Sequence, residues 1–230
     1  MKKQTTFTQD YKPQFSGHET FPLRYGWLEK AFEAVDDSRL NNKKIFAESA
    51  AIAHFGVGKN MVAAIRFWAQ VAGILTTDGK DVRTTEFGQQ LLGPNGRDPY
   101  LESASSLWKI HWDIASNPKH TATYWLFNFF NEPNFDRDTV LRRLIEFIDQ
   151  RGWKQPTEKT LSNDISVLLA NYVPSVPKRG PSEEAFNSPL TELGLIRRRS
   201  SGKFGMNLGR KPSLSNGVFL YAVCDFWERT

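Results

Sequence analysis

The sequence has a single cysteine among its 230 residues and no long hydrophobic run. One cysteine excludes an internal disulfide framework, which indicates a reducing compartment. No stretch approaches the roughly 20 apolar residues of a membrane-spanning helix, and no apolar segment follows the basic N-terminus as it would in a signal peptide. We therefore expect a cytoplasmic protein that does not bind membranes, in which Cys224 is buried as a small hydrophobic side chain.

Residues suited to catalysis or metal binding are also few. The four histidines are scattered, and no set of Cys, His, Asp or Glu has the spacing of metal ligands. Neither a Gly-x-Ser-x-Gly segment nor a Cys–His signature is present. The segment GVGKN (56–60) departs from a phosphate-binding loop, because Ala53 and Asn60 stand where that loop needs Gly and Ser or Thr. We expect no catalytic residues, no metal and no cofactor.

What the sequence does contain is enough apolar material for a core and an excess of positive charge. Hydrophobic residues make up 40% and aromatic residues 13%, and the net charge is +5. This composition argues against wholesale disorder and is compatible with a polyanionic partner.

The N-terminal segment, 15–98, has the element order of a winged helix. Apolar residues recur at helical spacing, two helices are separated by a glycine-containing turn as in a helix-turn-helix, and an Asp-Gly pair signals a hairpin. The expected elements are a helix that is capped by Thr20, carries Pro22 in its first turn and runs to Val35, helices at 45–55 and 59–72, a hairpin turning at Asp78-Gly79, and a closing helix at 86–92.

The remaining chain suggests a bridge and a second module of the same kind. Residues 99–135 are rich in aromatic side chains, and we expect two helices there, interrupted at Asn117-Pro118. The predicted fold is mainly α with small β-hairpins: tandem winged-helix-like modules joined by aromatic-rich helices. Within the second module, 136–230, the expected elements are helices at 136–152 and 160–172, a short helix or strand at 189–196, a basic hairpin around Ser201-Gly202, and an apolar helix over 218–227.

Positive charge is concentrated where such modules would contact DNA. No acidic residue occurs between Glu192 and Asp225, a stretch that holds six of the candidates. Basic and small polar side chains on recognition helices and wings contact phosphates and bases. Each of these residues alone also fits an ordinary solvated charge or a helix cap. The candidate DNA-binding residues are Lys59, Asn60, Arg66, Lys80, Arg83, Lys159, Thr160, Asn163, Arg197, Arg198, Arg199, Lys203, Arg210 and Lys211.

Four segments of the chain carry a family resemblance. FSGHETFPLRYGWLEK (15–30), FGVGKNMVAAIRFWA (55–69), TEFGQQLLGPNGRDPYLE (85–102) and SLWKIHW (106–112) resemble the bacterial Domain of Unknown Function 4007 family. The resemblance implies no chemistry for individual residues. It does imply a genetic neighbourhood of DNA phosphorothioation and phage-defence genes, including a phosphoadenosine-phosphosulfate-reductase-like protein. The His18-Glu19-Thr20 segment is typical of the family.

Together these observations favour a DNA-binding accessory or sensing protein of a phosphorothioation or antiphage defence system. Two alternatives stay open. A transcriptional regulator of the same operon would act as a homodimer on a palindromic site. A protein–protein scaffold would dock the reductase-like sulfurtransferase and would have no DNA affinity.

Overall fold

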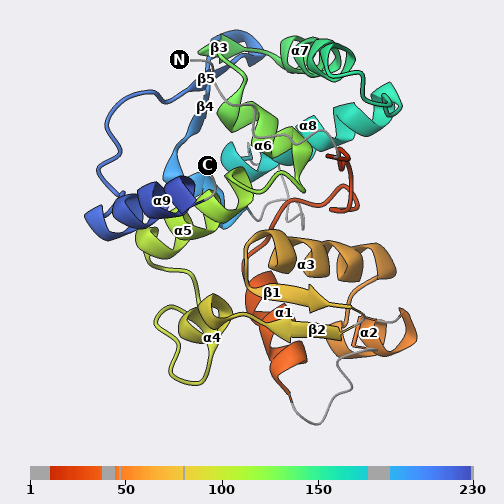
Figure 1. The fold of residues 1–230 in the computed structure, drawn as a ribbon, viewed down its shortest axis with the longest axis vertical. Coiled ribbons are helices and arrows are strands. Elements are labelled where there is room, and N and C mark those ends of the chain that lie inside the picture. The colour runs from red at the N-terminus through yellow and green to blue at the C-terminus, as the bar shows by residue number, and fades with distance from the viewer. Residues whose placement is uncertain (1–10, 38–44, 47, 80, 176–186, 229–230) are drawn as a thin grey trace.

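The protein is mainly helical, with small antiparallel strand pairs (Figure 1). The computed structural model describes residues 11–37, 45–46, 48–79, 81–175 and 187–228. An N-terminal half and a C-terminal half lie one above the other in Figure 1. The N-terminal half comprises α1 (Trp27–Asp36), α2 (Glu48–Phe55), α3 (Lys59–Val71), β1 (Leu75–Asp78), β2 (Asp81–Thr84) and α4 (Glu86–Leu92).

The C-terminal half is built from helices and one three-stranded sheet whose strand order is β3-β5-β4. The sheet is antiparallel throughout. Phe204 on the central strand β5 lies opposite Phe135 of β3 on one side and opposite Arg198 of β4 on the other. Its elements are α5 (Ala104–Ala115), α6 (Thr121–Asn128), β3 (Asn134–Phe135), α7 (Arg137–Gln150), α8 (Glu158–Tyr172), the 3-10 helix η2 (Pro189–Leu193), β4 (Ile196–Arg198), the 3-10 turn η3 (Ser200–Gly202), β5 (Phe204–Met206) and α9 (Asn216–Glu228).

The core follows the apolar stripes of the helices. In the N-terminal half α1 and α2 pack against α3, whose Ile65 and Trp68 are fully buried. In the C-terminal half α7 and α6 pack against α8, and Leu144 and Ile148 of α7 are fully buried. Burying a large apolar side chain contributes roughly 1.5–3 kcal/mol, so these stripes account for the helix positions.

Several elements lie where the sequence pattern placed them. The closing helix is α4, capped by the Thr85 hydroxyl, which accepts the Gly88 N–H. The bridge consists of α5 and α6, interrupted at Asn117 and Pro118 as expected. The first hairpin turns at Asp78-Gly79, and β4 and β5 form the basic hairpin.

The expected start of the first helix is wrong. Helix α1 begins at Trp27, after Gly26 in a left-handed conformation with φ of 75°, and not near Thr20. Thr20 itself has a φ of 66°. Residues 11–25, which we call the N-terminal arm, instead use their backbone to bond distant helices, and this competes with a local helix.

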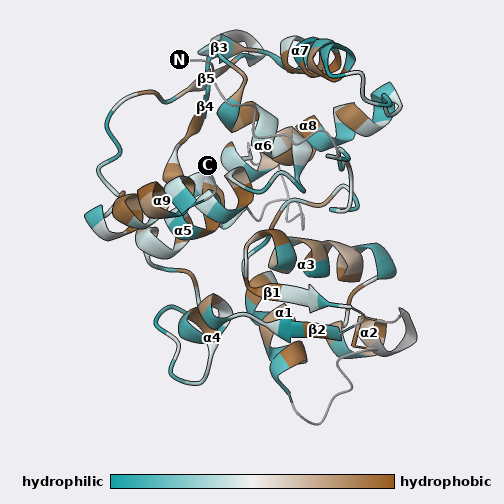
Figure 2. Ribbon diagram, viewed as in Figure 1, coloured by the Kyte–Doolittle hydropathy of each residue, from teal (hydrophilic) through white to brown (hydrophobic). Residues whose placement is uncertain are grey.

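Helix α9 differs from expectation in its burial. None of its residues is fully buried, and it packs along one side against α5. Its apolar character is visible in Figure 2. Cys224 is therefore exposed rather than buried. Among the described residues, none of the helices combines the length and apolarity that crossing a bilayer requires.

A glycine substitution tests the junction between the halves. Gly73 has a φ of 72°, and a Cβ there would lie 2.9 Å from Oδ2 of Asp113 on α5. We expect Gly73→Ala to lower the free energy of unfolding by about 1–2 kcal/mol, the cost of a left-handed non-glycine residue, as measured by urea denaturation. The matched control is Gly217→Ala in α9, where a Cβ meets nothing within 4 Å. If Gly217→Ala lowered the free energy of unfolding as much as Gly73→Ala, this interpretation would be contradicted.

Candidate nucleic-acid interface

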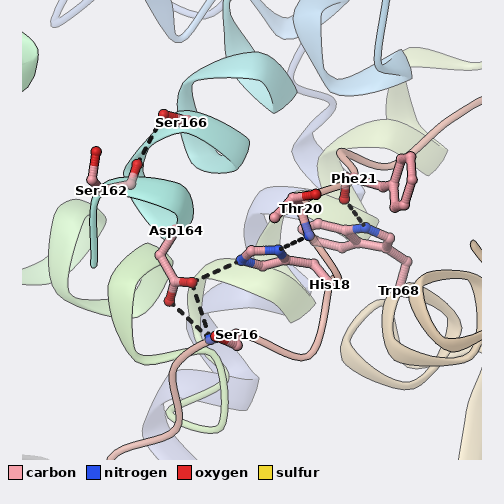
Figure 3. Close-up of polar contacts among 8 residues, drawn as sticks. All are labelled: Ser16, His18, Thr20, Phe21, Trp68, Ser162, Asp164 and Ser166. Carbon is pink, nitrogen blue, oxygen red and sulfur yellow. Dashed lines mark hydrogen bonds and ion pairs between the residues drawn. The ribbon is translucent and has the colours of Figure 1, made fainter. Parts of the chain in front are cut away.

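A buried polar contact joins the N-terminal arm to α8 (Figure 3). Nε2 of His18 lies 3.0 Å from Oδ1 of Asp164, and both residues are 1% exposed. The Thr20 N–H donates to Nδ1 of His18 at 3.2 Å, so the ring proton lies on Nε2 and is donated to the carboxylate. The Ser16 N–H reaches both carboxylate oxygens at 3.0 and 3.1 Å. Asp164 thus receives two donors from the arm.

Further bonds hold the same arm against both halves. The Leu23 N–H donates to Oδ1 of Asn171 on α8 at 2.9 Å, and Nε1 of Trp68 on α3 donates to the Phe21 carbonyl at 2.9 Å. Because the arm bonds α8 on one side and α3 on the other, it fixes the halves relative to each other.

His120, the N-cap of α6, is buried beside this contact. Its ring lies edge-on to the rings of His18, Phe67 and Trp68, at centroid distances of 6.0, 5.3 and 5.5 Å. Neither ring nitrogen has a hydrogen-bond partner among the described residues. Burial, with the neighbouring His18 as a lesser cause, lowers the pKa of His120 to about 3. Protonation of this ring therefore opposes folding.

The candidates of the N-terminal half are only partly available to DNA. Lys59 and Asn60 are exposed at the start of α3. The Arg66 guanidinium lies 5.6 Å from the centroid of Phe46, and Arg83 pairs with Asp78 at 3.4 Å across the hairpin. Lys80 lies outside the described residues. The described residues of this hairpin therefore offer little uncompensated positive charge.

One of the candidates at the start of α8, Thr160, bonds the residue that caps this helix. Thr157 is the N-cap, and its hydroxyl accepts the Thr160 N–H at 3.2 Å. The Thr160 hydroxyl bonds that of Thr157 at 2.9 Å. Lys159 is exposed and Asn163 is half-buried. Its bonds to the N-cap therefore explain a threonine at position 160 without a DNA contact.

The basic hairpin gathers four of the candidates. All four are exposed: Arg197 and Arg198 lie on β4, and Arg199 and Lys203 flank the turn between β4 and β5. None of the four forms an ion pair with a carboxylate among the described residues. The Arg198 guanidinium lies 5.5 Å from the ring centroid of Phe204, which is 4% exposed. Stacking of this kind leaves the N–H edge of the guanidinium available to an anion.

The two remaining candidates follow the hairpin. Arg210 is exposed. Lys211 is half-buried, and its ammonium donates to the backbone carbonyls of Asn207 and, at 2.6 Å, of Gly209. This bonding gives Lys211 a structural role in closing the loop that precedes α9.

Sequence reasoning missed two residues beside the hairpin. Arg137, at the first position of α7, and Asn187, before η2, line one cavity with Arg198 and Phe204. Arg137 and Asn187 lie 50 positions apart in the sequence, and neither belongs to a basic cluster. Only the tertiary fold brings them together.

Both the sequence and the fold have counterparts among known proteins. The model of a family described as "Protein of unknown function (DUF4007)" matches residues 15–230. The chain belongs to this family. It is also similar to two solved structures, described as the magnesium-ion-bound SspB crystal structure and the SspB crystal structure, at 29% identity in both cases and with TM-scores of 0.83 and 0.82. Each covers 94% of this chain, whereas this chain covers 66% of each. No curated protein matches the sequence.

Removing the carboxylate of Asp164 tests how much its buried contact with the N-terminal arm stabilises the fold. The Asp164→Ala substitution leaves the buried His18 Nε2–H and the Ser16 N–H without their acceptor. We expect the free energy of unfolding to fall by about 3 kcal/mol or more, as measured by urea denaturation. Ser162→Ala, at an exposed position two residues away on α8, serves as the control and should change it by less than about 0.5 kcal/mol. Equal effects would argue against the contact.

The buried histidines predict acid sensitivity. Burial lowers the pKa of both His111 and His120 to about 3, whereas in the unfolded chain histidine titrates near ~6.5. Between these values the unfolded state binds more protons, so stability is full above pH ~6.5 and falls as the pH drops, by up to about 1.4 kcal/mol per pH unit for each histidine.

The variant His120→Phe separates the contribution of His120 to this acid sensitivity from that of His111. We expect His120→Phe to remove roughly half of the decrease in unfolding free energy between pH 7 and pH 5, since only His111 then remains. The control is His54→Phe at an exposed position on α2, which should leave the pH dependence unchanged. An unaltered pH profile in His120→Phe would show that His120 is not the titrating group.

Proposed function

We propose that this protein is a DNA-binding accessory or sensing protein of a DNA phosphorothioation or antiphage defence system. The hairpin of β4 and β5 is its main contact with the DNA backbone. The N-terminal helix-turn-helix contributes a second, smaller contact through the exposed start of α3.

The observation that carries this proposal is the uncompensated charge of the hairpin. Two arginines elsewhere have acidic partners: Arg83 pairs with Asp78 at 3.4 Å, and Arg143 bonds Glu132 at 2.6 Å and Glu146 at 3.0 Å. Among the described residues none of the exposed cations of the hairpin forms such an ion pair, although Lys203 interacts electrostatically with Asp136. Neutralisation of phosphates, with release of their counterions, supplies most of the free energy of non-specific DNA binding. An exposed strand pair with consecutive arginines suits that role.

The order of elements in both halves supports DNA binding in a weaker way. In the N-terminal half α2 and α3 are followed by the hairpin of β1 and β2, and in the C-terminal half α7 and α8 precede the hairpin of β4 and β5. Helix, turn, helix and hairpin is the order of winged-helix modules. Since fold does not determine function, the charge distribution carries the proposal.

The phosphorothioation context rests on the family resemblance. One SspB structure is described as magnesium-ion-bound. Among the described residues of this chain, no three His, Cys, Asp or Glu side chains gather into a metal-binding group, whereas Mg²⁺ in proteins prefers carboxylate oxygens.

Salt dependence of DNA binding tests the proposal. With Arg197, Arg198, Arg199, Lys203 and Arg210 each neutralising one phosphate, the log–log slope of affinity against salt should be about −4.5. The triple variant Arg197→Ala, Arg199→Ala, Lys203→Ala should reduce the slope by about 3. The measurement is fluorescence anisotropy on one duplex, with and without a phosphorothioate, across a salt series.

Arg97→Ala provides a control that removes one positive charge away from the hairpin, because Arg97 is exposed in the loop between α4 and α5. It should leave the slope unchanged. Tighter binding to the sulfur-bearing duplex would make the protein a reader of the modification. Absence of binding at low salt to either duplex would overturn the proposal.

Helix α9 favours a second candidate, a scaffold for the reductase-like sulfurtransferase. Phe219, Leu220, Phe226 and Trp227 are 59, 63, 55 and 79% exposed on this one helix. Together with Trp108 and Trp112 of α5 the helix borders a mainly apolar groove, and exposed apolar surface of this kind is typical of protein contacts. Leu220→Glu with Phe226→Glu should abolish co-purification with that partner and leave DNA binding intact. Unchanged co-purification would remove this candidate.

A further inference from the structure

A small cavity lies between the basic hairpin and the ends of two helices. Its volume is about 200 Å³. This is below the roughly 300–1,000 Å³ of pockets for drug-sized ligands, so its occupant is a small group. Its lining consists of Pro22, Arg137, Leu169, Ala170, Val173, Ser175, Asn187, Arg198 and Phe204.

Two guanidinium groups line this cavity without an acidic partner. Neither the Arg137 nor the Arg198 side chain forms an ion pair or a hydrogen bond among the described residues. The Arg198 guanidinium lies over the Phe204 ring, at 5.5 Å from the ring centroid. A guanidinium in such a cation–π contact keeps its planar fork of N–H donors, which matches the geometry of phosphate oxygens.

The amide of Asn187 adds a third donor group. Its Oδ1 accepts from the Ser175 N–H at 2.7 Å and from the Ser175 hydroxyl at 2.9 Å. These two bonds fix which side of the amide is oxygen, so the NH₂ side is the free one. Among the described residues no acceptor bonds that NH₂ group. The described residues of the cavity therefore offer N–H donors to an occupant, while the Asn187 oxygen is already bonded by Ser175.

The walls behind these donors are apolar. Leu169, Val173 and Phe204 are buried, at 2, 5 and 4% exposed. Charges interact more strongly beside a low-dielectric wall than in open water. The carboxylate of Asp136, next to Arg137 in the sequence, accepts the Thr139 N–H at 2.8 Å as the cap of α7. Bonding to the Thr139 backbone N–H is the main cause that keeps the pKa of Asp136 below its usual value, and Lys203 of the hairpin is a lesser cause.

We propose that this cavity binds a phosphomonoester, with Arg137 and Arg198 as its charge partners and the Asn187 amide as a further donor. Two guanidinium groups match the roughly twofold negative charge of a phosphomonoester near neutral pH, whereas a diester within a strand carries one. The group can come from the end of a DNA strand or from a free nucleotide. Binding of the end of a DNA strand in this cavity rests on the proposed function, DNA binding. Binding of a free nucleotide there does not.

The experiment compares a short single-stranded DNA with a 5′-phosphate against the same strand with a 5′-hydroxyl. Binding is measured by fluorescence anisotropy with a 3′ label, at fixed salt, on the full chain. We expect the phosphorylated strand to bind at least tenfold tighter. The double variant Arg137→Gln, Arg198→Gln should abolish that difference, and Asn187→Asp should reduce it by adding a negative charge to the cavity.

Arg142→Gln is the matched control, since Arg142 is exposed on α7 and does not line the cavity. Thermal unfolding of each variant confirms that it is folded. Displacement of the strand by inorganic phosphate or a nucleoside monophosphate in the wild-type protein, but not in the double variant, would identify free anions as ligands too.

Two outcomes would overturn the proposal: equal affinity for both strands together with no binding of free phosphate, or a difference that persists in the double variant. Salt-dependent duplex binding alongside either outcome would leave the proposed function standing without the pocket. Binding of a nucleoside monophosphate without any binding of DNA would support the anion site in the cavity and overturn the proposed DNA binding.

Discussion

The bond between the His18 imidazole and the Asp164 carboxylate holds together residues that are 146 positions apart in the sequence. Both groups are buried, so neither can exchange the other for water, and loss of one partner leaves the other with an unmet desolvation cost. The same arm binds α3 through Trp68 and α8 through Asn171. The two halves therefore share one polar junction and do not behave as two modules joined only by a linker.

This junction constrains which surfaces are available for DNA. In a winged-helix protein the recognition helix presents its outer face to the major groove. Here Phe67 and Trp68 of α3 face His18 and His120 at the junction. The exposed residues of α3 are Lys59, Asn60 and Ala63, and its Arg66 and Gln70 are half-buried. The balance of positive charge consequently lies in the C-terminal half, on the hairpin of β4 and β5.

Local signals predicted elements well and long-range contacts poorly. Helix α4 follows from a Thr cap and two buried leucines, and the break between α5 and α6 follows from Asn117-Pro118. The start of α1 was mispredicted because the backbone of residues 16–23 bonds α3 and α8, a competition that helical periodicity does not contain. The exposure of Cys224 was missed for a related reason: apolar spacing marks a helix, but it does not show whether another element covers it. Arg137 and Asn187 were missed because only the fold brings them beside Arg198.

The hairpin has an electrostatic cost that no ion pair among the described residues offsets. Two like charges about 4 Å apart repel by about 1 kcal/mol in water, and by several times more at the lower effective dielectric near a protein surface. Arg197, Arg198 and Arg199 are consecutive, and Lys203 lies across the turn. Stacking on Phe204 orders one guanidinium but neutralises none. A structure that places carboxylates beside Arg83 and Arg143 leaves these cations unpaired among its described residues, so a bound anion would relieve the repulsion that the chain itself leaves in place.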